Sequence, residues 1–287
     1  MRVIGVDPAT EVARRATETG IKTIEGYFTP DIARKIKNEH GLASIITANN
    51  VIANVDDLKL FTEGIKELLA PDGVFIFETS YLLDVIDKML VETIFHEHLS
   101  YFSAKPLALF FQTMGLQLID VFRVPTKGGS LRGVVQLADG VRMQSAAVQE
   151  LINLETKTGL FTPEIFISYS RRLDKIKNHL QFLLSDLKGR CKTIAGYGAS
   201  VGVTTLLYLF ELNRFLDFIV DDNPKKQNLF SPGHHIPVLA PEVLDGRKHD
   251  YILILAWAYA EPIIKKHTNF QNQGGKYIIP LPEVKLI

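Results

Sequence analysis

The chain has 287 residues, and its 32 lysines and arginines are balanced by 32 aspartates and glutamates. This length suits one large domain or two ordinary ones, and 46% hydrophobic with 22% charged residues is typical of a globular protein with a sizeable core. The zero net charge gives no electrostatic reason to expect nucleic acid or an anionic membrane as a partner. The single cysteine, Cys191, excludes internal disulfides and zinc sites made of several cysteines.

The N-terminal stretch, Met-Arg-Val-Ile-Gly-Val-Asp-Pro, lacks the pattern of a signal peptide. No apolar run in the sequence is long enough to span a bilayer as a helix. Together these two observations predict a cytoplasmic protein.

In the first half of the chain, short apolar stretches alternate with helical patterns, which is typical of a parallel sheet flanked by helices. The expected strands are 3–6, 22–27, 44–48, 74–78, 116–124 and 131–137, and the expected helices begin near Pro8 and Thr29 and cover 56–69 and 106–114. Gly128-Gly129 is too short a link for a parallel crossover, so the last two strands should be antiparallel.

The second half begins with a helical pattern over residues 144–187. Apolar side chains recur there every three or four residues, at Leu173, Ile176, Leu180, Leu183, Leu184 and Leu187. This spacing predicts a helix packed between two domains. A second α/β unit should follow, with strands at 193–195, 217–220, 251–256 and 277–279.

Residues 95–98, Phe-His-Glu-His, follow the strand predicted at 74–78 and carry the densest chemistry of the chain. A carboxylate such as that of Glu97 beside an imidazole such as that of His98 raises its basicity and makes it a proton acceptor near pH 7. His96 and His98 without a cysteine or third histidine nearby are a weak metal signal. From the pattern alone, a catalytic acid/base pair and ordinary structural histidines are equally acceptable interpretations.

Polar residues also end two other predicted strands of the first half. Asp7 could accept hydrogen bonds from a ribose, but an aspartate after a strand is more often a helix cap, and spacing alone favours the cap. Asn49 and Asn50 end a buried strand at the edge where open α/β sheets hold ligands, or they shape a turn.

In the second half, the turn Gly196-Tyr197-Gly198-Ala199-Ser200 opens a helix after a strand, where backbone amides and the helix dipole attract an anion. Asp221-Asp222 follows at the distance expected of a ribose-binding acid. His234-His235 should lie at the mouth of the same cleft. A nicotinamide-dependent oxidoreductase is disfavoured because the turn lacks a full dinucleotide motif.

Taken together, these motifs resemble those of the sugar C-methyltransferases. Ile94–Ser103 is similar to the family segment Tyr-His-Glu-His-Leu-Ser-Tyr, and three further stretches match in order: 127–132, 196–200, and 220–224 running on to 232–237. The resemblance covers nearly the whole chain. It implies an α/β fold: a truncated class I methyltransferase (Rossmann-like) domain over 1–140, a helical linker over 141–190 and a second Rossmann-like domain over 191–287.

The resemblance implies S-adenosylmethionine as the cofactor and a nucleotide-linked keto-deoxysugar as the substrate. His98, with His96 and Glu97 beside it, becomes the candidate base that forms an enolate for methyl transfer to carbon. Asp7, Asn49 and Asn50 become cofactor ligands, and Asp7 thereby changes from a cap to the ribose acid. The residues expected at the substrate are Gly196, Gly198, Ala199, Ser200, Asp221, His234 and His235.

The chain departs from the family pattern in two respects. Phe95 replaces the family tyrosine, and the chain begins at the second strand of the methyltransferase domain, without the zinc module and the Gly-rich turn. The sheet should therefore have an exposed edge, open to a separate chain carrying the missing part or to a second copy. A truncated or split-gene protein that binds a nucleotide sugar without independent activity is the alternative to an active enzyme.

Overall fold

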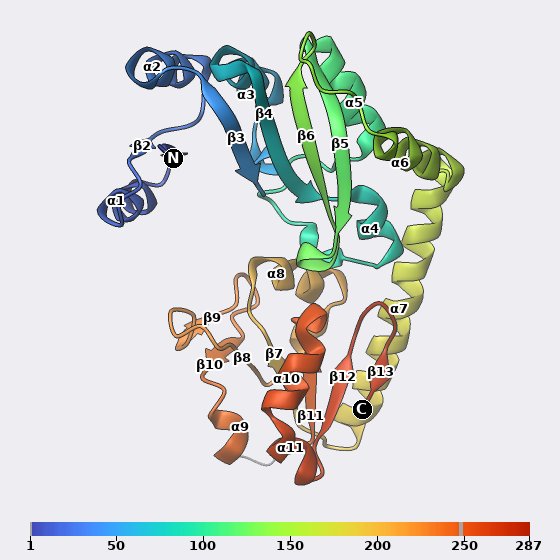
Figure 1. Ribbon diagram of the computed structural model, residues 1–287. Coiled ribbons are helices and arrows are strands. Elements are labelled where there is room, and N and C mark those ends of the chain that lie inside the picture. Colours follow the sequence, from blue (N-terminus) through green and yellow to red (C-terminus); the bar gives the residue numbers. More distant parts are fainter. Residues whose placement is uncertain (1, 247–248) are drawn as a thin grey trace. The chain divides into compact units, whose positions relative to one another are not determined.

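The structure is a computed structural model that describes residues 2–246 and 249–287 (Figure 1). The chain divides into two compact units. The first comprises residues 1–81, 99–124 and 130–157, and the second comprises residues 82–98, 125–129 and 158–287. None of the helices formed by the described residues is long and apolar enough to cross a membrane.

The first unit contains a four-stranded sheet in the order β3 (Ala43–Asn49), β4 (Leu69–Ser80), β6 (Ser130–Leu137), β5 (Leu116–Val124). β3 and β4 are parallel, whereas β6 is antiparallel to both β4 and β5, which confirms the antiparallel pair expected around Gly128-Gly129. β1 (Gly5–Asp7) and β2 (Thr23–Glu25) form a separate parallel pair. The single sheet expected for this half of the chain is therefore divided, and among the described residues β3 pairs on one side only because β1 and β2 do not join it.

Aromatic side chains form the core of the first unit. Phe75 and Phe77 alternate along β4 and are fully buried, and both contact Phe111 of α5 (Ala104–Thr113). Phe61 of α3 (Leu58–Leu68) packs edge-on against Phe75. The other helices of this unit are α1 (Thr10–Glu18), α2 (Pro30–His40), the 3₁₀ turn η1 (Ile52–Asn54) and α6 (Ala146–Lys157).

Glu155 of α6 is a buried carboxylate that organises the start of α5. It accepts hydrogen bonds from the backbone amides of Ala104 and Lys105, at 2.6 and 3.0 Å, and from the hydroxyl of Tyr81 at 3.0 Å. The first amides of a helix have no partner within the helix, so a carboxylate there satisfies them and interacts favourably with the helix dipole.

The second unit is built on a seven-stranded sheet in the order β13-β12-β11-β7-β8-β10-β9. Its strands are β7 (Ile194–Tyr197), β8 (Phe218–Val220), β9 (Leu229–Phe230), β10 (Pro237–Leu239), β11 (Tyr251–Ile254), β12 (Lys276–Ile279) and β13 (Lys285–Leu286). The five central strands are parallel, and only β9 and β13 are antiparallel to their neighbours.

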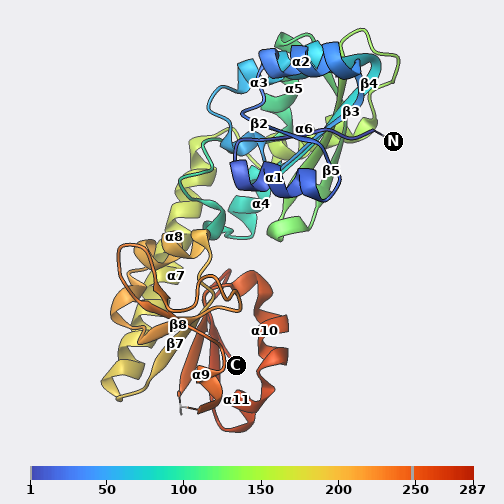
Figure 2. The same ribbon diagram turned by 90° about the vertical axis from the view of Figure 1, so that its left-hand side faces the viewer.

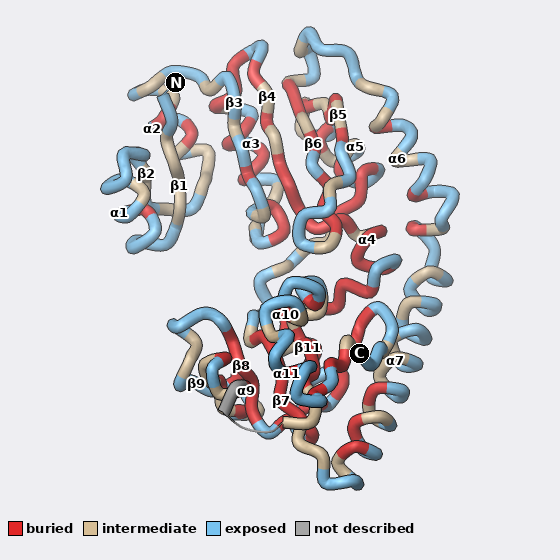
Figure 3. The backbone as a smooth tube through the Cα atoms, turned by 60° about the horizontal axis from the view of Figure 1, so that its bottom comes forward, coloured by how far each residue is buried: buried red, intermediate tan, exposed pale blue. Residues whose placement is uncertain are grey.

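Helices cover both faces of this sheet (Figures 1 and 2). On one face α7 (Pro163–Gly189) and α8 (Val201–Leu209) pack on Ile194, Ile219 and Leu253. On the other face lie α9 (Val243–Gly246), α10 (Ala260–Lys266) and α11 (Thr268–Asn272). Buried and exposed residues alternate along α7 (Figure 3), and its buried leucines, Leu180, Leu184 and Leu187, belong to the repeat seen in the sequence.

The two units do not follow the expected domain boundaries. The stretch 141–190, expected to be a linker, is divided: α6 belongs to the first unit and α7 to the second. Residues 82–98, with α4 (Leu82–Asp87) and the 3₁₀ turn η2 (Val91–Thr93), also belong to the second unit. Met89 and Val91 explain this, because both are fully buried in the core that α7, α8 and the second sheet share.

Candidate functional site

The strand order of the second sheet reverses beside β7. From β7 the chain proceeds outward through β8 to β10, and then returns to place β11 and β12 on the opposite side of β7. In open α/β sheets ligands bind in the crevice outside the carboxyl ends of the strands at such a reversal. The loops at this position are residues 198–200, after β7, and residues 255–257, after β11.

These two loops are in close contact. Gly198 adopts a left-handed conformation with φ +101°, and a Cβ atom there would lie 2.6 Å from Cβ of Ala256. Only glycine meets both demands, which gives a physical reason for the second glycine of the Gly-Tyr-Gly turn. The amide of Ala199 donates to Oδ2 of the buried Asp221 at 2.7 Å. The structure therefore brings together the predicted residues Gly196, Gly198, Ala199, Ser200 and Asp221.

His234 and His235 lie elsewhere, contrary to the expectation that they share this cleft. They precede β10, which is parallel to β8, so they lie at the amino edge of the sheet, whereas Asp221 follows β8 at the carboxyl edge. The reason is β9, whose antiparallel course returns the chain to the amino edge before the histidines. The ring of His234 stacks on Tyr208 at 4.1 Å, and that of His235 is exposed.

The segment that carries the Phe-His-Glu-His motif is docked on α8. A Cβ atom on Gly202 of that helix would lie 2.0 Å from the carbonyl oxygen of Glu92, so the helix backbone and η2 are in direct contact. The hydroxyl of Thr205, one helical turn later, donates to the carbonyl of Ile94. With Val91 in the core, these contacts attach the segment to the second unit at three successive points.

Within the motif, His98 is the residue with a defined orientation. Its Nδ1 lies 2.7 Å from the carbonyl oxygen of Thr93, and its ring packs on Phe95 at 4.1 Å. Because a carbonyl only accepts, Nδ1 must carry a proton, which leaves the lone pair of the neutral imidazole on Nε2. The partner of Nδ1 is thus a backbone carbonyl, where the sequence suggested Glu97. His96 and Glu97 are exposed.

Two residues at this site escaped sequence analysis. Trp257, in the 3₁₀ turn η5 (Trp257–Tyr259) after β11, donates from Nε1 to Oε2 of Glu92 at 2.9 Å. Burial raises the pKa of Glu92 to about 7, against the opposing effect of hydrogen bonds from its own backbone and from Trp257. Two features of the sequence could have pointed to Trp257: it is the only tryptophan of the chain, and it directly follows a predicted strand. Nothing in the sequence marks Glu92 as partly buried.

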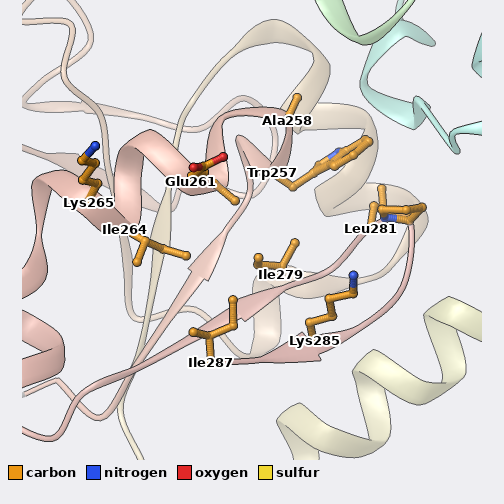
Figure 4. Close-up of a pocket in the computed structure, with 11 residues that line it drawn as sticks. Trp257, Ala258, Glu261, Ile264, Lys265, Ile279, Leu281, Lys285 and Ile287 are labelled. Atoms are coloured by element: carbon orange, nitrogen blue, oxygen red, sulfur yellow. The ribbon is translucent and has the colours of Figure 1, made fainter.

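Trp257 also lines a pocket of about 600 Å³ between α10 and the strands β12 and β13 (Figure 4). The lining is mostly apolar, with Ile264, Ile279 and Leu281, and it includes the charged residues Glu261, Lys265 and Lys285. Trp257 therefore contributes to two neighbouring features: its indole N–H binds Glu92, and its side chain borders the pocket.

The other predicted residues belong to the first unit. Asp7 ends β1, and its Oδ1 accepts from the amide of Ala9 at 2.8 Å. The N-cap of α1 is Ala9 and has no side-chain hydrogen bond, so Asp7 is not the helix cap that the spacing favoured. Asn49 ends β3 with an exposed side chain, and Asn50 is left-handed at φ +56°. Asp7 and the asparagines thus end strands of two different sheets. None of the described residues forms a His, Cys, Asp and Glu cluster suited to a metal ion.

Beside Asn49, an ion pair between the buried Glu78 and the exposed Arg132 continues across the sheet. Asn49 is in register with Glu78 of β4, and Glu78 with Arg132 of β6. Both Nε and Nη2 of Arg132 donate to Oε2 of Glu78, at 3.0 and 2.7 Å. This pair fixes the carboxyl end of β4 next to the asparagines.

Two family models match the chain. Residues 125–282 match the C-methyltransferase C-terminal domain, and residues 1–121 match a methyltransferase domain. The C-methyltransferase NovU of Streptomyces niveus is 34% identical over 287 residues, which are all of this chain and 68% of that protein.

Solved structures are more distantly similar. A SAM-dependent methyltransferase from Anabaena variabilis is 17% identical, with a TM-score of 0.37 over 47% of this chain and 68% of that one. The PH0226 protein of Pyrococcus horikoshii is 16% identical, with a TM-score of 0.37 over 48% of this chain and 72% of that one. Similarities at this level say nothing about function.

Proposed function

Because the chain belongs to the C-methyltransferases, enzymes that depend on S-adenosylmethionine, we propose that it methylates a carbon next to the keto group of a nucleotide-linked deoxysugar. The methyltransferase family is shown by the whole-chain match, whereas the sugar substrate is our inference. It rests on the resemblance of the histidine segment and on the arrangement around His98.

The observation that carries the proposal is the hydrogen bond between Nδ1 of His98 and the carbonyl of Thr93. It holds the imidazole in the tautomer whose Nε2 accepts a proton. Nε2 would take the proton from the carbon beside the ketone, and the electron pair of that C–H bond would move onto the carbonyl oxygen to give an enolate. A positioned base of this kind contributes about 10² to 10⁴ in rate. When bound, S-adenosylmethionine supplies the methyl group to which the enolate carbon forms its new bond.

The residues of the first unit fit the adenosine half of this cofactor. Asp7 is a carboxylate at the carboxyl end of β1, fixed through one oxygen by the amide of Ala9. The other oxygen suits the hydroxyls of a ribose, and the exposed amide of Asn49 suits the edge of an adenine. We therefore assign cofactor binding to Asp7, Asn49 and Asn50.

The nucleotide sugar is assigned to the reversal point of the second sheet, at Gly196–Ser200 and Asp221. The carboxylate of Asp221, which accepts the amide of Ala199, can also accept hydroxyl groups but repels an anionic phosphate, so this position favours a hydroxyl-bearing sugar. His234 and His235 are not assigned to the substrate, because they lie at the opposite edge of the sheet.

Hydrogen–deuterium exchange tests the base separately from the methyl transfer. The protein is incubated in D₂O with a nucleotide-linked keto-deoxysugar, with and without S-adenosylmethionine, and the sugar is analysed by mass spectrometry. We expect deuterium at the carbon beside the ketone without cofactor, and a methyl group with it. Exchange without methylation would favour the alternative of a truncated protein without independent methyltransferase activity. If the sugar were neither deuterated nor methylated, the proposal would be refuted.

His98→Ala should lower the exchange rate by about 10² to 10⁴, because the base is removed while its surroundings stay. His179→Ala is the matched control, since His179 is an exposed histidine on α7 of the same unit. Equal thermal melting of both variants would show that the fold is intact. Exchange that persists in His98→Ala would remove His98 from the mechanism.

A further inference from the structure

Glu92 is a half-buried acid in a contact that is otherwise mostly apolar. It lies between Val91, which is fully buried, and Thr93, which is 7% exposed, and its backbone packs against Gly202 of α8. Helix α8 is Val-Gly-Val-Thr-Thr-Leu-Leu-Tyr-Leu and brings no charged side chain to this contact. Besides the hydrogen bond from its own backbone, the carboxyl group accepts one from Trp257, at the reversal point of the second sheet.

We propose that Glu92 is a positioning residue for the methyl transfer, and that its hydrogen bond with Trp257 clamps the segment bearing His98 to the loop after β11. This inference rests on the proposed role of His98 as the base. Glu92 itself does not touch the reacting atoms in this account. It acts through the backbone that presents the partner of His98.

The path from Glu92 to His98 is short. The residue after Glu92 is Thr93, whose carbonyl oxygen is the partner of Nδ1 of His98. The hydroxyl of Thr93 donates to the carbonyl of Leu90 at 2.7 Å and closes the 3₁₀ turn in which Glu92 sits. A rotation of that turn therefore moves the Thr93 carbonyl, and with it the imidazole and its tautomer. The indole N–H of Trp257 is the contact that opposes such a rotation from outside the segment.

Withdrawing an ionisable group from solvent costs folding free energy that an apolar residue at this position would not cost. Burial raises the pKa of Glu92 to about 7, so the carboxyl group changes charge in the neutral range. Strongly perturbed groups of this kind gather at functional sites. The titratable groups on the elements around it are Tyr208 of α8, Tyr259 of η5 and, within residues 82–98, Asp84, Asp87, Lys88, His96, Glu97 and His98. A carboxylate accepts the indole N–H more strongly than the neutral acid does.

Tryptophan fluorescence measures the clamp directly, because Trp257 is the only tryptophan in the protein. The emission of the wild-type protein should titrate with a midpoint near pH 7, as the acceptor of the indole N–H changes charge. Glu92→Gln keeps a hydrogen-bond acceptor and removes the titration, so this transition should disappear. Tyr259→Phe, on the same 3₁₀ turn, should keep it. A transition that survives in Glu92→Gln would overturn the assignment of the clamp.

The tautomer of His98 tests the positioning without any turnover. In protein labelled with ¹⁵N-histidine, the His98 signals are assigned by their loss in His98→Gln. We expect a protonated Nδ1 in the wild-type protein and in Glu92→Gln, and loss of this preference in Glu92→Ala and Trp257→Phe. If the tautomer of His98 stayed the same in both Glu92→Ala and Trp257→Phe, the inference would be overturned. Trp257→Phe keeps the test valid if Glu92→Ala does not fold.

Kinetics separate this inference from the proposed function. Glu92→Ala and Trp257→Phe should lower kcat by up to about 100-fold, the effect of misplacing a catalytic group by about 1 Å. KM should change little, because the affected group does not bind the ground state. A wild-type protein that neither exchanges nor methylates the sugar would refute the proposed function. Variants with unchanged kcat beside an active wild type would refute only the role of Glu92.

Discussion

The contact between Gly202 and Glu92 makes Gly202→Ala a sharp test of how the histidine segment is held. The added Cβ would lie 2.0 Å from the carbonyl oxygen of Glu92, which is 1.4 Å short of the 3.4 Å at which ordinary contact begins. The same Cβ would lie 2.8 Å from the carbonyl carbon, so the obstacle is backbone. A backbone atom cannot rotate away as the end of a side chain can, and η2 must therefore move off the helix.

The size of the effect differs between stability and catalysis. Overpacking costs about 1 to 3 kcal/mol, and alanine in place of glycine inside a helix returns about 1 kcal/mol. The net loss of unfolding free energy should thus be about 0 to 2 kcal/mol. A displacement of about 1 Å at the base costs about 100-fold in rate, which corresponds to about 2.7 kcal/mol of barrier. Activity should therefore suffer more than stability.

The assay combines urea unfolding with the deuterium exchange of the keto-sugar. Gly189→Ala is the matched control, because Gly189 lies at the end of α7 and a Cβ there meets nothing within 4 Å. This control should unfold at the same or a slightly higher urea concentration and exchange at the wild-type rate. If Gly202→Ala behaved like Gly189→Ala in both measurements, the segment would not be docked on α8 and the reasoning would be wrong.

Three further predictions concern buried or paired carboxylates. Glu155→Ala should lower the unfolding free energy in urea by about 3 kcal/mol, because Tyr81 and two backbone amides lose their acceptor, and a loss below about 1 kcal/mol would contradict this. The hydrogen bond from Lys192, followed by that from the Thr193 amide, lowers the pKa of Asp250 to about 2, so this group stabilises the fold above its ordinary pKa. Asp250→Asn should therefore cost about 1 kcal/mol at pH 7, and its difference from the wild type should fade as the pH falls through about 2. The pKa of Glu92 is raised instead, so ionisation costs stability as the pH rises through about 7, and Glu92→Gln should melt above the wild type at pH 8 but not at pH 5. An equal difference at both pH values would exclude this linkage.

Local patterns predicted much of the fold. The leucines of α7 are buried as their spacing indicated, and the strands around Gly128-Gly129 are antiparallel. The start of β4 was harder to place, because Pro71-Asp72-Gly73 reads as a helix stop. The strand instead begins at Leu69 and contains this stretch, with a shift in its register to β3.

The candidate site depended on long-range features that periodicity does not record. The chain reverses its direction before His234 and His235 through a strand of only two residues, Leu229–Phe230. A strand this short gives no hydrophobic pattern in the sequence. The hydrogen bond that partly buries Glu92 against Trp257 joins residues 165 positions apart. An acid in a sequence is expected to be fully solvated, and only packing reveals that this one is partly withdrawn from solvent.

The chain passes between the two units five times, after Tyr81, His98, Val124, Gly129 and Lys157. A graft that exchanged the carboxyl-terminal halves of two relatives at residue 125 would leave residues 82–98 behind. Met89 and Val91 of one relative would then pack in the second-unit core of the other. Trp257 of one relative would likewise have to pair with the residue at position 92 of the other. Chimaeras designed to change substrate choice should therefore carry residues 82–98 together with the half that begins at residue 125.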